Sequence, residues 1–167
     1  EKSTQYLEQM EKEIKSYEAQ NKTGNKVLDA VLTSKSLYCQ NKGIGFTCVA
    51  DGTLLNFMAE MDISALFGNI LDNAIEGAEK LPEQEKRLIH LSVTQQKKFL
   101  RIRVENYCEE KLVFKNGIPQ TTKKDKRFHG FGMKSIQSTV KKYGGSVTAG
   151  VRDNWFELRI LIPLNDK

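Results

Sequence analysis

The stretch from Asp62 to Lys80 constrains the fold most, because its apolar residues recur at helical spacing. They form one wide apolar face, made of Ile63, Leu66, Phe67, Ile70, Leu71, Ala74, Ile75 and Ala78. Polar residues gather on the opposite side, namely Asp62, Asn69, Asn73, Glu76 and Lys80. The sequence therefore predicts an amphipathic helix that Asp62 or Ser64 caps and Pro82 closes, with its apolar face packed on a sheet.

Two asparagines, Asn69 and Asn73, stand four residues apart in this helix. Asparagine is a mediocre helix former, so two of them in mid-helix cost stability unless their amides are used. One interpretation is a solvated polar face. The other is a ligand site, because amide and carboxylate oxygens are ligands that Mg²⁺ accepts. The helix alone does not decide between them.

Length and composition indicate a soluble globular protein with one domain and at most a small appendage. The chain has 167 residues, of which 39% are hydrophobic and 28% charged. It contains no apolar run long enough to cross a membrane and no signal peptide. It begins with Glu1 rather than Met, so we expect it to be part of a longer protein.

The net charge of +5 is concentrated locally. Basic residues cluster in 111–127 and are not interleaved with aromatic residues that could stack on bases, which argues against nucleic acid and favours a local anion such as phosphate. The odd number of cysteines and their lack of metal-ligand spacing indicate reduced thiols in a cytosolic protein. These cysteines are Cys39, Cys48 and Cys108.

Three more helices are predicted. Residues 1–21 carry apolar residues at a and d positions, and this helix either dimerises or packs on its own domain. Those positions are Leu7, Met10, Ile14 and Tyr17. A helix over 26–40 follows a capping segment that ends in Asn25. The last helix is opened by Gly130-Phe131-Gly132-Met133 and stopped by Gly144.

Alternating apolar and polar residues predict five strands, mostly antiparallel. They lie at 44–49, 89–94, 99–106, 147–151 and 156–162. His90 falls on a polar side and is expected to be exposed rather than catalytic. A sheet with helices on one face gives a two-layer α+β sandwich, whereas the strand order argues against a doubly wound dinucleotide fold.

Several features are typical of an ATP site when they occur together. The strand over 99–106 ends in Asn106, and the aperiodic segment 107–129 carries six basic residues. Gly130-Phe131-Gly132 at a helix start can cradle a phosphate, although it matches neither a dinucleotide fingerprint nor a Walker loop. Together with the helix that carries Asn69 and Asn73, these features would supply a metal ligand, a polar residue that reads the edge of the nucleotide, a basic lid and a phosphate cradle.

The sequence resembles the GHKL ATPase superfamily, which includes gyrase, heat-shock chaperones, mismatch-repair proteins and sensor histidine kinases. Residues 66–76 look like its N box and residues 129–136 look like its second glycine box. Within the superfamily, the chain is most similar to receptor histidine kinases that respond to quorum-sensing peptides, the accessory-gene-regulator-like group. Residues 23–32 and Thr121-Thr122-Lys123 match that group, and the resemblance covers about 23–163.

The resemblance implies a Bergerat-type fold with ATP between the N-box helix and a lid. Asn73 would coordinate Mg²⁺ through its side-chain oxygen and Asn69 would support the triphosphate. Gly130 and Gly132 would cradle phosphates, and Lys123 would reach them from the lid. The other implied ATP-binding residues are Gly77, Asn106, His129, Phe131 and Met133. Residues 23–167 would form the catalytic domain, and residues 1–22 the remnant of a dimerisation hairpin's second helix.

Two departures from the family pattern matter. The first glycine box is replaced by Asn106-Tyr107-Cys108-Glu109-Glu110, so Asn106 stands where the family has an adenine-reading Asp. Its amide oxygen can still accept a hydrogen bond from the adenine amino group. No residue matches the phosphoacceptor His, whose helix we expect upstream of Glu1.

The resulting expectation is a histidine kinase that binds Mg-ATP and transfers the γ-phosphate to that upstream His. The parent protein would be a membrane-anchored homodimer that presents this domain to the cytoplasm and acts on a response regulator, without nucleic acid. The altered glycine box favours an alternative, a non-catalytic nucleotide-binding or dimerisation module. A third, an anti-sigma-type Ser kinase, would not need an upstream dimerisation helix.

Overall fold

The computed structural model describes residues 1–109, 114–115, 118–119 and 131–165, and its centre is a five-stranded sheet in the order β1-β2-β3-β7-β6. These strands are β1 (Gly45–Ala50), β2 (Leu88–Gln96), β3 (Phe99–Tyr107), β6 (Ser146–Arg152) and β7 (Trp155–Pro163). The β1–β2 pair is parallel, and β2–β3, β3–β7 and β6–β7 are antiparallel. The five predicted strands and their mostly antiparallel pairing are therefore confirmed.

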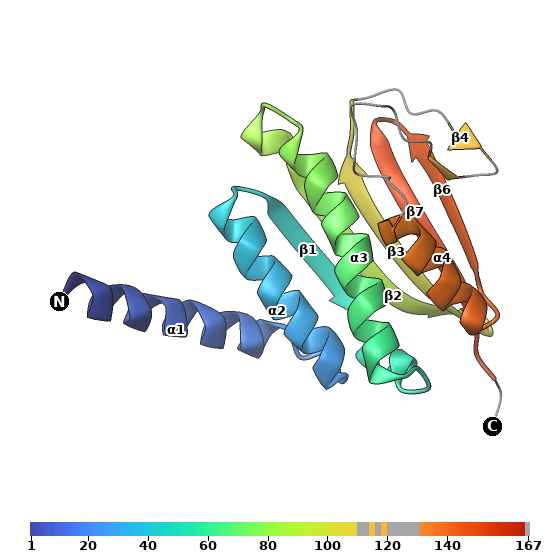
Figure 1. The fold of residues 1–167 in the computed structure, drawn as a ribbon, viewed down its shortest axis with the longest axis horizontal. Coiled ribbons are helices and arrows are strands. Elements are labelled where there is room, and N and C mark those ends of the chain that lie inside the picture. Colours follow the sequence, from blue (N-terminus) through green and yellow to red (C-terminus); the bar gives the residue numbers. More distant parts are fainter. Residues whose placement is uncertain (110–113, 116–117, 120–130, 166–167) are drawn as a thin grey trace.

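Helices cover one face of this sheet, so the fold is the predicted two-layer α+β sandwich (Figure 1). They are α2 (Lys26–Asn41), α3 (Glu60–Glu79) and α4 (Phe131–Lys142), with short 3-10 turns η1 (Gly52–Leu55) and η2 (Gln84–Lys86). Two short strands, β4 (Phe114–Lys115) and β5 (Ile118–Pro119), pair with each other within the segment 107–129, where the sequence predicts no regular structure.

The alternation within β3 shows how the sequence divides the two faces. Leu100, Ile102 and Val104 are at most 3% exposed and pack under the helices. The residues between them, such as Arg101 and Arg103, point to the opposite face. This period of two is the pattern from which the strand was predicted.

Helix α3 forms the centre of the helical layer. All eight residues of its predicted apolar face are buried. The predicted cap is wrong, however, because the helix begins at Glu60 with Ala59 as N-cap and without a side-chain capping bond. Asp62 lies in the first turn, where its carboxylate interacts favourably with the helix dipole. Its hydrogen bonds go to Lys142 and Tyr143 at the end of α4.

The segment between α1 (Lys2–Gln20) and α2 is closely fastened to the domain. Asn25 is the predicted cap, and its Oδ1 accepts the backbone N–H of Leu28 at 3.0 Å. The backbone N–H of Gly52 donates to the Thr23 carbonyl at 2.8 Å. A Cβ on Gly52 would lie 2.2 Å from Thr23 Oγ1, so this crossing requires glycine.

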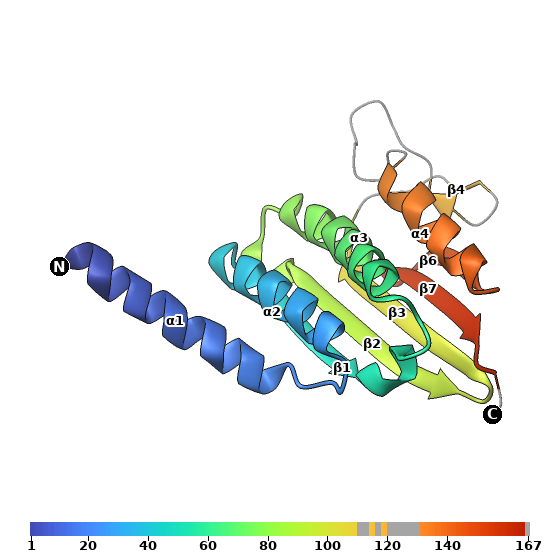
Figure 2. The same ribbon diagram turned by 60° about the horizontal axis from the view of Figure 1, so that its bottom comes forward.

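Helix α1 extends away from the sandwich and contributes no buried residue (Figures 1 and 2). Near its end, Tyr17 Oη donates to Gln40 Oε1 of α2 at 2.7 Å. Earlier in the helix Tyr6, Leu7 and Met10 remain 66%, 59% and 40% exposed. The interpretation of these positions as a dimerising stripe stays a prediction. Among the described helices, none has the length and apolar character that a membrane span requires.

Candidate functional site

Asn73 and Gly132 meet where α4 begins beside the middle of α3. Asn73 is only 9% exposed, and a Cβ built on Gly132 would lie 3.4 Å from Asn73 Oδ1. The Asn73 Nδ2 is buried and has no hydrogen-bond partner within the part of the chain that the structure describes. An unsatisfied buried donor costs about 1–3 kcal/mol. The interpretation of Asn73 as part of a solvated face is therefore wrong, and its carboxamide is suited to a ligand.

Asn69 lies one helical turn before Asn73 and also faces α4. It is half-buried, and its Nδ2 donates to Ser135 Oγ at 3.1 Å. A carboxamide that donates through its nitrogen presents its oxygen as an acceptor. Sequence reasoning did not single out Ser135, although its position three residues after Gly132 puts it on the same side of α4.

Asn106 ends the helix-covered side of β3 and is 3% exposed. Its Nδ2 donates to the Tyr107 carbonyl at 3.2 Å, which again leaves the amide oxygen as the acceptor. Gly77 and Met133 are also buried. The carboxyl ends of α3 and β3 lie at the same end of the domain (Figure 1).

Three of the predicted site residues, Lys123, His129 and Gly130, lie outside the described residues, as does most of the predicted lid. Phe131 begins α4, but its side chain also lies outside them. The part of the predicted site that can be placed therefore consists of the α3 asparagines, the start of α4 and the end of β3.

Lys86 stabilises the chain where it leaves β3, a role that the sequence did not reveal. Its Nζ contacts Glu109 at 2.7 Å and Glu83 at 2.6 Å, and it lies 5.9 Å from the centre of the Tyr107 ring. The hydrogen bonds to Glu109 and then Glu83 raise the pKa of Lys86. The ammonium joins the segment before β2 to the segment after β3.

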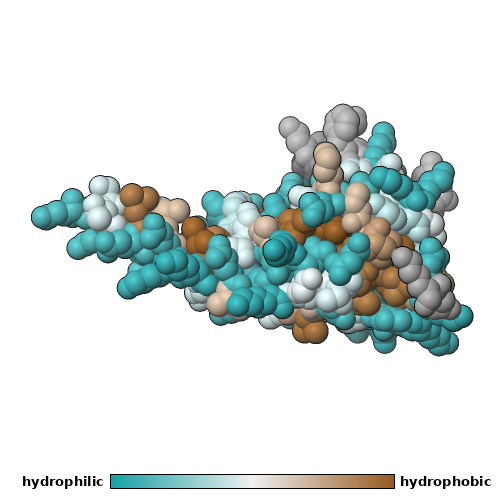
Figure 3. Space-filling view, turned by 90° about the horizontal axis from the view of Figure 1, so that it is seen from below, coloured by the Kyte–Doolittle hydropathy of each residue, from teal (hydrophilic) through white to brown (hydrophobic). Residues whose placement is uncertain are grey.

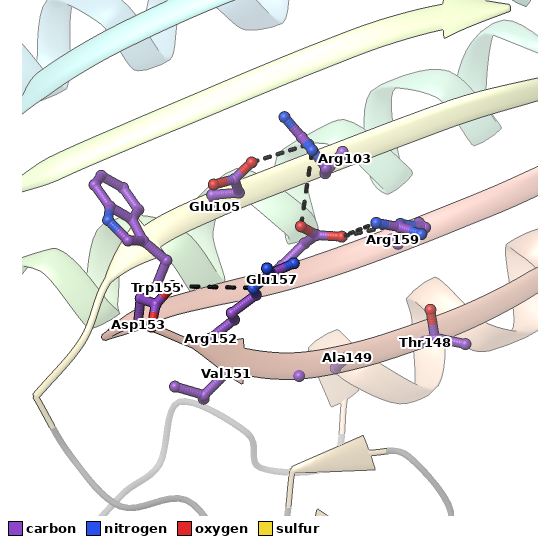
Figure 4. Close-up of a pocket in the computed structure, with 11 residues that line it drawn as sticks. Arg103, Glu105, Thr148, Ala149, Val151, Arg152, Asp153, Trp155, Glu157 and Arg159 are labelled. Atoms are coloured by element: carbon purple, nitrogen blue, oxygen red, sulfur yellow. Dashed lines mark hydrogen bonds and ion pairs between the residues drawn. The ribbon is translucent and has the colours of Figure 1, made fainter. Parts of the chain in front are cut away.

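A depression of about 580 Å³ lies on the sheet face opposite the helices (Figure 4). Its charged residues pair with one another: Arg103 contacts Glu105 at 2.9 Å, and Arg159 contacts Glu157 at 2.8 Å. His90 borders this face and is exposed as predicted, and its ring lies tilted against that of Trp155 with ring centres 5.1 Å apart. Because the carboxylates and guanidinium groups that line this depression pair with one another, it does not resemble a phosphate site.

Solved structures of histidine kinases share this fold. The catalytic domain of histidine kinase ThkA, in a nucleotide-free form, aligns with a TM-score of 0.61 and 16% identity, covering 85% of this chain and 94% of that one. Histidine kinase AdeS of Acinetobacter baumannii gives a TM-score of 0.55 and 12% identity over 84% of this chain and 64% of its own. The histidine kinase domain of a blue-light activated kinase, EL346 of Erythrobacter litoralis, gives 0.51 and 17%, over 78% and 57%.

At these identities the likeness establishes the fold, and sequence comparison supplies the family. No curated protein matched the chain. The model of the GHKL domain, however, matches residues 58–163, which is more than half of the 167 residues. The matched range includes α3, α4 and the end of β3, which together form the described part of the candidate site. The resemblance to the GHKL superfamily is thereby confirmed, and the chain belongs to the GHKL domain family.

Proposed function

We propose that this chain is the ATP-binding catalytic domain of a sensor histidine kinase, and that it binds Mg-ATP beside the start of α4. The observation that carries the proposal is the buried Asn73 carboxamide, which lies against Gly132 and has an unpartnered Nδ2 within the described residues. A nucleotide phosphate or its water shell next to Asn73 would give this amide the partners that the protein does not supply.

The donor set near Asn73 fits magnesium held jointly with a nucleotide. No cluster of three or more His, Cys, Asp or Glu side chains in the described ranges is arranged to bind a metal. Mg²⁺ commonly takes one or two protein oxygens and completes its shell with phosphates and water. In this proposal Asn73 Oδ1 is the protein ligand, and the ion neutralises charge on the phosphates.

The remaining residues bind and orient the nucleotide. Gly132 and Gly130 bring backbone N–H groups and the positive end of the α4 dipole to the phosphates. Asn69 supports the triphosphate, and Lys123 reaches it from the lid. Asn106 accepts the adenine amino group through its amide oxygen. Gly77, His129, Phe131 and Met133 line the same nucleotide.

Phosphotransfer in this proposal rests on positioning and charge neutralisation. The accepting histidine belongs to a segment outside the 167 residues, and a response regulator receives the phosphoryl group from it. Helix α1, with its exposed apolar residues, continues into the dimerisation hairpin of a homodimer. The matches at 23–32 and 121–123 support a membrane-anchored peptide receptor whose kinase domain is cytoplasmic.

Calorimetric titration of Mg-ATP into wild type, Asn73→Ala and Asn25→Ala tests the site. Asn25 is a matched control because it is also 9% exposed, but it caps α2 away from the site. We expect Asn73→Ala to lose about tenfold or more in affinity, which is about 1.4 kcal/mol. Asn25→Ala should bind as wild type does. Equal affinity of wild type and Asn73→Ala would remove the metal assignment.

The replacement of the adenine-reading Asp by Asn106 supports a second candidate, a module that binds nucleotide without turnover. Incubation with labelled ATP and a histidine-bearing hairpin fragment supplied in trans separates the two. A kinase domain transfers label to the hairpin, and Asn73→Ala abolishes the transfer. Nucleotide binding without transfer, under every pairing tried, would favour the non-catalytic module.

A further inference from the structure

Helix α3 begins with a capping arrangement that is completed by Tyr143, the residue that follows α4. In a capping box, the side chain of the third helical residue bonds the N–H of the N-cap residue. Here Asp62 is that third residue and Ala59 is the N-cap. The Tyr143 hydroxyl lies between them, because Tyr143 Oη accepts the Ala59 N–H at 3.0 Å and donates to Asp62 Oδ2 at 2.5 Å.

Lys142 strengthens the same junction. Its Nζ donates to Asp62 Oδ2 at 2.8 Å, so this carboxylate oxygen binds both the last residue of α4 and the residue after it. The hydrogen bond from Lys142 has the largest effect on the pKa of Asp62, and with the bond from Tyr143 it lowers that pKa. The Tyr143 ring also packs edge-on against Phe57 with ring centres 5.7 Å apart. This end of the domain exposes apolar surface, which Figure 3 views from below.

The contacts between α3 and α4 continue to the candidate nucleotide site. Their partners run in opposite sequence directions: Asp62 contacts Tyr143, Asn69 contacts Ser135, and Asn73 lies against Gly132. The two helices are therefore antiparallel neighbours, as Figure 2 shows. The Asp62 contacts lie at one end of this series and the Asn73 contact lies at the other.

Apolar packing and hydrogen bonds both hold α4 in position along α3. Met133, Ile136 and Val140 of α4 are buried, and they hold the helices together through contacts that have no strong direction. Hydrogen bonds have narrow ranges of distance and angle. The hydrogen bonds at Asp62 and the bond between Asn69 and Ser135 therefore add directional constraints to the position of α4 along α3.

We propose that Asp62 and Tyr143 are positioning residues for the nucleotide site, and that their hydrogen bond sets the spacing of Gly132 and Ser135 from the α3 asparagines. The ligand in this inference rests on the proposed function, whereas the register of the helices rests on the contacts alone. Neither Asp62 nor Tyr143 touches the reacting groups. They act through the placement of Asn69 and Asn73.

The test is Tyr143→Phe, which removes the hydroxyl and keeps the ring beside Phe57. Tyr38→Phe is its matched control, because Tyr38 Oη donates to Glu79 Oε1 at 2.6 Å on the exposed α2–α3 side. The first readout needs no nucleotide. We expect the side-chain ¹H–¹⁵N resonances of Asn69 and Asn73 to shift in Tyr143→Phe and to stay unchanged in Tyr38→Phe.

The second readout is the affinity for Mg-ATP at a temperature where both variants are folded. We expect Tyr143→Phe to weaken it about threefold to tenfold, which lies within the range of coupling carried by packed contacts, with Tyr38→Phe equal to wild type. Asp62→Asn, which keeps the shape of the side chain and removes its charge, should weaken affinity in the same direction. It serves as the test variant if Tyr143→Phe does not fold.

Unmoved Asn69 and Asn73 resonances, with only a lower melting temperature, would overturn the inference and leave Tyr143 as a cap. Shifted resonances with unchanged Mg-ATP affinity would also overturn it, because the register would then not matter for the ligand. If wild type binds no nucleotide but the resonances shift as expected, the proposed function fails while the register that Tyr143 sets is supported.

Discussion

Asn25 and Asn73 are equally exposed, at 9%, but their carboxamides are used differently. Asn25 Oδ1 accepts the Leu28 N–H at 3.0 Å, and its Nδ2 donates to Asn56 Oδ1 at 3.2 Å. Both ends of that amide are satisfied inside the protein. The Asn73 amide nitrogen has no such partner among the described residues. Two residues of the same type and burial thus separate into a structural cap and a candidate ligand.

Cys39 and Cys48 carry a prediction at the residue scale. Burial raises the pKa of each thiol from 9.0 to about 11, and Glu79 adds to the effect at Cys39. Well below pH 9 both thiols are protonated in the folded and the unfolded chain. As the pH rises from about 9 to 11, the unfolded chain loses these protons first, so the free energy of unfolding should fall.

Urea denaturation between pH 8 and 11 checks this expectation. Wild type should lose more stability over that interval than a variant in which both Cys39 and Cys48 are replaced by Ala. The comparison between the two proteins removes the contributions of Lys and Tyr titration, which they share. Identical pH profiles for the two proteins would contradict the raised thiol pKa values.

At the scale of elements, the sequence predicted helices and strands wherever short-range periodicity specifies them. The apolar face of α3 is buried over its full length, and Asn25 caps α2 as expected. The start of α3 could not be predicted, because the group that completes its cap is the Tyr143 hydroxyl, 81 residues away from Asp62. Short-range sequence patterns predict a cap at Asp62 or Ser64, because they do not reveal a partner as distant as Tyr143.

The Asn25 cap leads to a prediction about α2. Loss of an N-cap side chain costs about 0.5–2 kcal/mol, so Asn25→Ala should lower the free energy of unfolding by about 1 kcal/mol. Asn56→Ala removes only the second hydrogen bond of Asn25 and should cost less. Chemical denaturation of both variants measures the difference. The cap assignment would be wrong if Asn56→Ala were the more destabilising of the two.

At the scale of the whole molecule, the sheet separates a helix-covered face with the candidate site from an open face of paired charges. The sequence predicted the two layers, because β3 alternates between residues such as Val104 and Arg103. It could not predict that Arg103 of β3 would meet Glu157 of β7, because these strands are far apart in the chain. Nor could it reveal that Ser135 binds Asn69, because that contact depends on how α3 and α4 pack.

The central claim is that a metal–nucleotide complex binds beside Asn73. Its most direct test is the broadening of assigned NMR signals by a trace of Mn²⁺ in place of Mg²⁺, with ATP present. The account predicts strong broadening of the Asn73 side-chain and Gly132 backbone signals, and little change at Trp155 on the open face. Broadening at Trp155 in preference to Asn73, or no ATP-dependent broadening at either site, would contradict it.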